Sequence, residues 1–185
     1  MGRLTERTDQ ELMLAARAGE LDALDLLFVR HHRRLYGFLA RLTGDRHVAE
    51  DLVQEVFLRL LRFRTSYSGD GSFVAWLFRI ARNVAADQFA RRRAVDPIDP
   101  DTTAVDEPSA LDRMVTDERR ERYERALRTL PAEHREALLL RGTEGLPYRD
   151  VAAALGCSEG AARVRVHRAL VAIKRTLHAL AGDTA

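Results

Sequence analysis

The feature that most constrains the fold is an acidic, proline-containing stretch at residues 95–117, which divides the chain in two. It holds three of the five prolines of the chain, seven acidic residues and one arginine. This composition has no helical period and predicts an extended, solvated linker. We therefore expect one domain at residues 1–94 and a second at residues 118–185. A negative tether that folds back and masks the basic domains is the other interpretation.

The charge distribution follows the same division. The first 94 residues hold 16 arginines and 12 acidic residues, a net charge of +4, whereas residues 95–117 carry −6. Residues 118–185 hold 13 basic and nine acidic residues, again +4. Two basic blocks that flank an acidic spacer favour contact with nucleic acid at both ends of the chain.

Apolar residues recur every three to four positions on both sides of the linker, as in amphipathic helices. The predicted helices span residues 10–18, 21–42, 47–64, 73–93, 111–130, 131–141, 148–155 and a last segment from residue 159. Asp9 and Ser72 are the expected N-caps of two of them. The pattern predicts an all-α fold of two small helical domains joined by a flexible acidic linker.

Several classes of protein are disfavoured by composition. No apolar run approaches the ~20 residues that span a bilayer, and the first residues lack the apolar region of a signal peptide. The single cysteine, Cys157, excludes an internal disulfide and a cysteine-based metal cage. The histidines are scattered, and His31 and His32, being adjacent, point about 100° apart and are expected in solvent or near phosphate. We expect a cytoplasmic protein without membrane insertion, metal or cofactor.

The segment FVAWLFRIARNVAADQFARRR, residues 73–93, combines an apolar face with an unusual opposite side. Phe78, Arg82, Phe89 and Arg93 project there, with Arg79 and Asn83 beside them. Aromatic rings interleaved with guanidinium groups suit a surface that neutralises phosphate and stacks on unpaired bases. The alternative is that Trp76, Phe78 and Phe89 are core residues of a helical bundle.

The predicted helix at 47–64 has an apolar side that faces a core and a second side of mixed character. On the second side an isolated leucine is ringed by polar groups, as in a small docking face for a protein partner. This face comprises Asp51, Gln54, Glu55, Leu58 and Arg62. Carboxylates paired for catalysis are the other interpretation, but they lack a pocket and a companion base or metal ion.

Residues 148–175 have the spacing of a helix-turn-helix. Pro147 suits the first turn of a short helix, Gly156 supplies the turn, and Ser158 caps the next helix. The core stripe of the second helix is expected at Ala162, Val166, Ala169, Leu170, Ile173 and Leu177. Its opposite face carries arginines that can grip phosphate or guanine, and small apolar residues that suit thymine methyl groups. A helical hairpin with a basic solvated surface is the alternative.

Three segments, in this order and spacing, resemble a group 4 sigma factor, the extracytoplasmic-function class of the sigma-70 family. They are AEDLVQEVFLRL (49–60), FVAWLFRIARNVAADQFARRR (73–93) and YRDVAAALGCSEGAARVRVHRAL (148–170). The resemblance implies a sigma-2 domain at 1–94 and a sigma-4 helix-turn-helix domain at 118–185. It also implies a non-enzymatic role in promoter recognition and transcription initiation, in a stress or envelope response.

The resemblance assigns partners as well. The sigma-2 docking residues Asp51, Gln54, Glu55, Leu58 and Arg62 would bind the clamp helices of the β′ subunit of core RNA polymerase, and the β flap is a further contact. The −10 promoter element would be contacted by Tyr67, Trp76, Arg79, Arg82, Asn83, Arg91, Arg92 and Arg93. The −35 element would be contacted by Ser158, Ala161, Arg163, Val164, Arg165, His167 and Arg168. An anti-sigma factor is also implied, although no residue identifies it.

Two departures and two rival classes bear on this assignment. Ala161 stands where the family commonly has threonine, and Val164 where it commonly has serine, which bears on promoter preference rather than on role. An autonomous helix-turn-helix regulator would need a dimer interface and a palindromic site, and no dimerisation helix is evident. An enzyme would need convergent ligands or a triad, which the scattered histidines do not offer.

Overall fold

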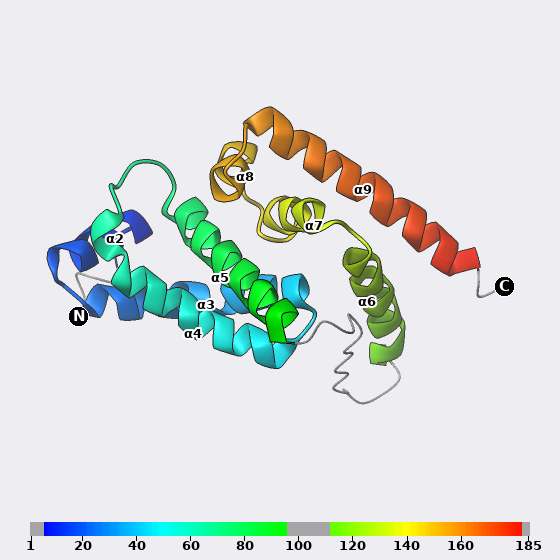
Figure 1. Ribbon diagram of the computed structural model, residues 1–185, viewed down its shortest axis with the longest axis horizontal. Helices are drawn as coiled ribbons and strands as arrows, with labels where there is room; N and C mark the ends of the chain where they lie inside the picture. The colour runs from blue at the N-terminus through cyan, green and yellow to red at the C-terminus, as the bar shows by residue number, and fades with distance from the viewer. Residues whose placement is uncertain (1–5, 96–111, 183–185) are drawn as a thin grey trace.

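The computed structural model describes residues 6–95 and 112–182, and every regular element in these ranges is helical (Figure 1). The first group of helices is α2 (Asp9–Ala18), α3 (Asp22–Thr43), α4 (Arg46–Arg62) and α5 (Phe73–Val95), with a short 3₁₀ turn at Arg64–Ser66. The second group is α6 (Asp112–Arg128), α7 (Ala132–Leu138), a π-helical segment at Leu139–Thr143, α8 (Tyr148–Leu155) and α9 (Glu159–Gly182). The all-α prediction is confirmed.

Local sequence explains where these helices begin and end. Thr8 caps α2, since its hydroxyl accepts from the Glu11 N–H while the Glu11 carboxylate accepts from the Thr8 N–H, a capping box. The expected cap, Asp9, is wrong by one residue because its carboxylate binds Arg30 and His31 instead. Gly44, at φ 75°, ends α3 in the left-handed conformation.

The expected linker at 95–117 lies mostly outside the described residues. Its two ends are helical, since α5 runs to Val95 and α6 begins at Asp112. The described residues on either side do not form separate bodies. Their buried apolar side chains make one continuous cluster that reaches from Leu12 in α2 to Ile173 in α9.

Helix α5 lies at the junction of the two groups. On one side it packs on α3 and α4, and on the other it packs on α8 (Figure 1). Phe73, Leu77 and Val84 are buried as the periodicity predicts, but Phe78 is fully buried too. Its ring meets Phe38 of α3 edge-on at 5.1 Å between centroids, so its expected place on the outer face is wrong. A helix covered on two sides needs apolar residues on both.

His31 is likewise not a solvent or phosphate-near residue. Its side chain is buried, its Nε2 lies 2.7 Å from the Asp9 Oδ2, and its ring packs against Phe73. Burial lowers the pKa of His31, although Asp9 acts to raise it. His32 is half-buried and stacks on Phe28 at 5.0 Å. Sequence spacing correctly separated the two rings but did not show that one of them faces the α2–α3 contact.

Candidate polymerase and nucleic-acid interfaces

The outer face of α4 is an open surface with an apolar centre. The Leu58 side chain is 55% exposed, and Asp51, Gln54 and Arg62 are exposed around it. Glu55 is half-buried, because Arg59 holds its carboxylate at 2.8 Å. The same Arg59 reaches Asp87 of α5 at 2.7 Å, which fixes this face against the neighbouring helix. The side chains predicted to form a docking face therefore do lie together on the surface.

A shallow hollow adjoins this face on the α5 side. It is lined by Val48, Asp51, Leu52, Glu55, Gln88 and Arg91. Arg91, assigned from the sequence to DNA, thus borders the docking face as well. On the α3 side, Phe28 meets Phe57 of α4 at 4.9 Å, and both Phe28 and Leu61 expose apolar surface. Sequence reasoning missed this apolar extension, because it depends on which helix α4 packs against.

The loop before α5 folds over an aromatic cluster. Tyr67 packs against Phe73 and Trp76 at 6.0 and 5.0 Å between ring centroids. The Tyr67 side chain is 2% exposed, so it does not lie on the −10 surface expected for it. A glycine-rich loop predicts turns but does not reveal that one of its side chains turns inward. Trp76 is half-buried, and the Ser72 hydroxyl accepts the Ala75 N–H at 3.3 Å, as an N-cap should.

The basic side chains of α5 have different surroundings. Arg79 and Asn83 are exposed, as are Arg91 and Arg92, and Arg92 reaches Asp45 at 3.4 Å. Arg82 is half-buried and donates from Nε to the Glu136 Oε2 of α7 at 2.7 Å. The Arg93 side chain lies outside the described part of the chain. The surface predicted to bind the −10 element is therefore basic, but its middle faces the second helix group.

Helices α8 and α9 form the predicted helix-turn-helix. Gly156 ends α8 at φ 65°, and the Ser158 hydroxyl accepts the Ala161 N–H at 3.2 Å. The stripe of α9 at Ala162, Val166, Ala169 and Ile173 is buried. Leu170 is exposed instead of joining that stripe, and Cys157 in the turn is half-buried.

The outward face of α9 carries most of the residues assigned to the −35 element. Ser158, Arg163, Val164, His167 and Arg168 are exposed, and Ala161 is half-buried. Arg165 differs, because its guanidinium lies 2.8 Å from the Glu133 carboxylate of α7 and only a quarter of the side chain is exposed. The outward face of α9 is thus basic and partly apolar, and two of its arginines, Arg163 and Arg165, are paired with the carboxylates of Glu159 and Glu133.

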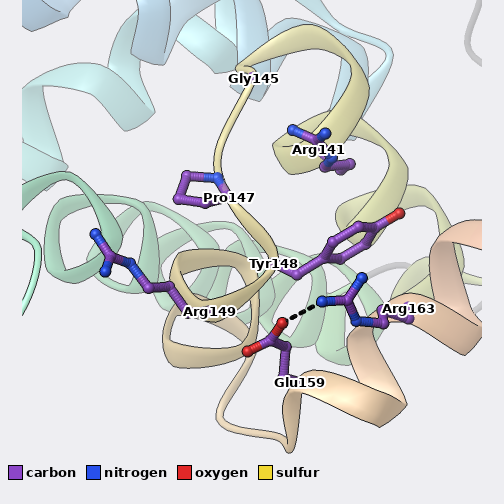
Figure 2. A pocket seen from close by; sticks show the side chains of 7 residues that line it. All are labelled: Arg141, Gly145, Pro147, Tyr148, Arg149, Glu159 and Arg163. Atoms are coloured by element: carbon purple, nitrogen blue, oxygen red, sulfur yellow. Dashed lines mark hydrogen bonds and ion pairs between the residues drawn. The ribbon is translucent and has the colours of Figure 1, made fainter.

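A second basic cluster lies beside this face, at the start of α8 (Figure 2). The Arg141 and Arg163 guanidinium carbons lie 5.1 and 4.4 Å from the centre of the Tyr148 ring, and Arg163 also pairs with Glu159. With the exposed Arg149, these side chains line a hollow of about 380 Å³. Sequence reasoning missed Arg141, because only the folded turn brings it over the Tyr148 ring seven residues away, and it missed the exposed Arg149 that lines the same hollow.

Within residues 6–95 and 112–182, no group of three or more histidine, cysteine or acidic side chains gathers closely enough to hold a metal ion. In the same ranges no helix is both long and apolar enough to cross a membrane.

Two family models match separate parts of the chain. A family model for sigma-70 region 2 matches residues 27–95, and one for sigma-70 region 4 matches residues 120–173. RNA polymerase sigma-H factor of Pseudomonas aeruginosa is 33% identical over 96% of this chain and 97% of its own length. RNA polymerase sigma factor CarQ of Myxococcus xanthus is 38% identical over 87% of this chain and 92% of its own. The ECF RNA polymerase sigma-E factor of Escherichia coli K12 is 32% identical over 94% of this chain and 96% of its own length.

Solved structures agree over both helix groups. The sigma factor RpoE of Bartonella quintana, in complex with the anti-sigma factor NepR, has a TM-score of 0.71 at 28% identity and covers 83% of this chain and 96% of its own. CnrH, in complex with the cytosolic domain of CnrY, also has a TM-score of 0.71, at 27% identity. That match covers 92% of this chain and 97% of CnrH. The paired family matches and full-length relatives show that this chain belongs to the sigma-70 family of RNA polymerase sigma factors, in its extracytoplasmic-function group.

Proposed function

We propose that the outer face of α4 docks this sigma factor on the clamp helices of the β′ subunit of core RNA polymerase. The observation that carries this proposal is the exposed Leu58, surrounded by Asp51, Gln54 and Arg62. An exposed aliphatic centre inside a polar rim is the usual composition of a small protein interface. The half-buried Glu55 completes the rim, and the β flap is a second contact for the 118–185 domain.

In the same proposal the two basic surfaces recognise the two promoter elements. The arginines of α5 neutralise the backbone near −10, and Trp76 offers a ring on which an unpaired base can stack. These arginines are Arg79, Arg82, Arg91, Arg92 and Arg93, and the neutral Asn83 can add a hydrogen bond. Because Tyr67 is packed beneath its loop, its contribution is to support the loop rather than to stack on a base. Unstacking a base costs a few kcal/mol, which such capture would offset.

The −35 element is assigned to the exposed face of α9. Ser158, Ala161, Val164, His167 and Arg168 lie on or near this face, and Arg163 and Arg165 extend it once released from Glu159 and Glu133. The division into a sigma-2 domain at 1–94, a linker at 95–117 and a sigma-4 domain at 118–185 is part of this proposal. Core polymerase would hold the two domains at the separation of the promoter elements and so couple two weak binding events.

Two assignments rest on the relatives. The solved structure of RpoE contains the anti-sigma factor NepR, and that of CnrH contains the cytosolic domain of CnrY, which supports an anti-sigma partner for this chain as well. A protein that docks on RNA polymerase would act in the cytoplasm, where the polymerase works, and the relatives support a stress or envelope response.

The docking face is tested by Leu58→Asp. We expect this substitution to abolish capture of the chain by immobilised core RNA polymerase, because it places a charge at the centre of the interface. Val29→Asp is the matched control, since Val29 is an exposed aliphatic residue on α3 of the same domain. Circular dichroism checks that both variants keep their helix content. Equal capture of Leu58→Asp and wild type would refute the docking face.

A further inference from the structure

Helix α2 uses two different sides of its surface. One side is apolar and packs into the core. Its buried residues are Leu12, Met13, Ala15 and Ala16. On another side, Gln10, Leu14 and Arg17 recur every three to four residues and so lie in one row along the helix, which we call the α2 stripe. All three side chains have exposed surface. The region 2 family match begins at residue 27, which leaves α2 and its stripe outside it.

The α2 stripe contacts the loop at residues 67–72, which joins the 3₁₀ turn to α5. The Arg17 guanidinium donates from Nη1 to the Tyr67 carbonyl at 2.8 Å, and the Gln10 side-chain amide donates to the Gly69 carbonyl. Between these two donors, Leu14 lies so close to the loop backbone that a Cβ atom added at Gly69 would stand 3.2 Å from the Leu14 Cδ2. Two hydrogen bonds and one apolar contact from α2 therefore fix the loop backbone at Tyr67 and Gly69.

Helix α2 is itself fixed to α3. The Asp9 Oδ1 accepts from the Arg30 Nη1 at 2.8 Å, and the Asp9 Oδ2 lies 2.7 Å from the His31 Nε2. The capping box between Thr8 and Glu11 orders the first turn of the helix. The support beside the loop is therefore a capped helix that is held by charge as well as by apolar packing.

The loop contains residues whose backbone accepts many shapes. Gly69 and Gly71 have φ of 84° and 78°, and the Asp70 N–H donates to the nearby Ser68 hydroxyl at 3.2 Å. The Tyr67 ring is buried in the aromatic cluster beneath the loop, whereas Ser68, Asp70 and Gly71 are exposed above it. Because glycine leaves the backbone free to adopt several conformations, contacts from outside the loop decide which one is populated.

We infer that Gln10 and Arg17 are positioning residues for recognition of the −10 element: α2 holds the 67–72 loop in the shape in which the loop and α5 bind an unpaired base. This inference rests on the proposed function, since it takes α5 and the loop before it as the −10 surface. A loop that is ordered before DNA arrives loses less conformational freedom on binding, so the bound complex is more stable. The base-dependent part of promoter binding therefore depends on a helix that need not touch DNA itself.

The first measurement follows the loop in the free, full-length chain. Trp76 is the single tryptophan of the sequence, and its ring centre lies 5.0 Å from that of Tyr67, so its fluorescence reports on the loop. We expect Arg17→Ala, and more strongly Gln10→Ala with Arg17→Ala, to shift Trp76 emission to the red and to increase its quenching by acrylamide. Arg17→Lys should stay near wild type, because a lysine ammonium can donate to the same carbonyl. Circular dichroism checks that each variant keeps its helix content.

The second measurement follows base recognition on core RNA polymerase. Polymerase loaded with each chain binds a pool of DNA duplexes that contain a short unpaired segment of random sequence, and the bound fraction is sequenced. We expect the wild-type chain to enrich particular bases beyond core polymerase alone. Gln10→Ala with Arg17→Ala should lower the enrichment of the most favoured base about tenfold, the scale of one stacked base. Arg33→Ala is the matched control and should keep the enrichment, because it removes the same charge from an exposed position on α3.

Unchanged Trp76 fluorescence in the double variant would overturn the inference. An enrichment that falls as far in Arg33→Ala or in Arg17→Lys as in the double variant would overturn it too. If the wild-type chain enriches no base beyond core polymerase alone, the proposed −10 surface is contradicted, and the positioning role that rests on it is contradicted as well. Capture of each variant by core polymerase, measured on the same preparations, reports on the docking face separately.

Discussion

Single arginines on α5 and α9, the two helices proposed to contact promoter DNA, are paired with acidic side chains. Arg163 pairs with Glu159 within α9, and Arg82 and Arg165 pair with carboxylates of α7. Burial raises the pKa of Glu136, although Arg82 acts to lower it. Burial thus costs the Glu136 carboxylate solvation, which offsets part of its attraction to Arg82 and limits the net stability that this pair adds.

Arg168 differs from these residues because it is exposed on the outer face of α9. We predict that Arg168→Ala makes the negative slope of log K, the association constant for duplex DNA, against log salt concentration less steep by about 0.9. This change corresponds to the loss of one phosphate contact. The measurement is a salt titration of duplex affinity with polymerase-bound protein. Lys174→Ala is the control, since Lys174 is exposed on the same helix but about 240° around from Arg168. An equal slope in wild type and Arg168→Ala would show that Arg168 makes no phosphate contact.

The buried His31 makes stability depend on pH. Its pKa lies below the ordinary value of 6.5 because of burial, so below about pH 6.5 the unfolded chain takes up the proton more readily than the folded chain. The free energy of unfolding should therefore fall as pH is lowered from about 7.5 to about 5.5. His31→Gln should show a smaller fall, measured by urea unfolding at the two pH values. The same pH dependence in both chains would contradict this role.

Among the elements, the helix-turn-helix depends most visibly on one backbone conformation. Gly156 has φ 65°, which costs a residue with a Cβ atom about 1 kcal/mol. We predict that Gly156→Ala destabilises the chain by about this amount in thermal or urea unfolding. Gly160→Ala is the control, because Gly160 lies inside α9 with room for a Cβ atom and should be neutral or stabilised by up to about 1 kcal/mol. Equal changes in the free energy of unfolding for Gly156→Ala and Gly160→Ala would show that a side chain at Gly156 does not strain the turn.

Helix periodicity in the sequence was sufficient for most elements. It gave α3, α4, α5, α8 and the start of α9 to within a few residues, because each has a clear apolar stripe and a cap or glycine at its end. It also placed Leu58 and its polar neighbours on one face. These are local properties, fixed by residues three and four positions apart.

The errors arose where burial depends on distant parts of the chain. Phe78 was placed on the outer face with a core position as the alternative, and the core position is confirmed because its ring packs on α3. Tyr67 was assigned to the −10 surface, yet it is buried against Phe73 and Trp76. His31 was expected in solvent and is instead paired with Asp9 across α2 and α3. Periodicity shows which residues share a face, but it does not show how many neighbours cover a helix. For the same reason, periodicity did not reveal the exposed apolar surface at Phe28 that extends the docking face.

For the whole molecule, the sequence predicted two modules and the family but not their contact. A linker with three prolines says nothing of how the modules meet, and the ion pairs at the junction join residues as far apart as Arg34 and Glu144. The described residues form one packed body, in which α5 packs against α8 of the helix-turn-helix.

The most direct test of the central claim is run-off transcription on a library of genomic fragments from the source organism. We predict new transcripts with defined 5′ ends when core RNA polymerase and the chain are combined. None should appear with either component alone or with Leu58→Asp. If the chain gives no new transcripts with core polymerase, yet protects specific DNA by itself, it acts as an autonomous regulator, and a polymerase-dependent role in initiation is contradicted.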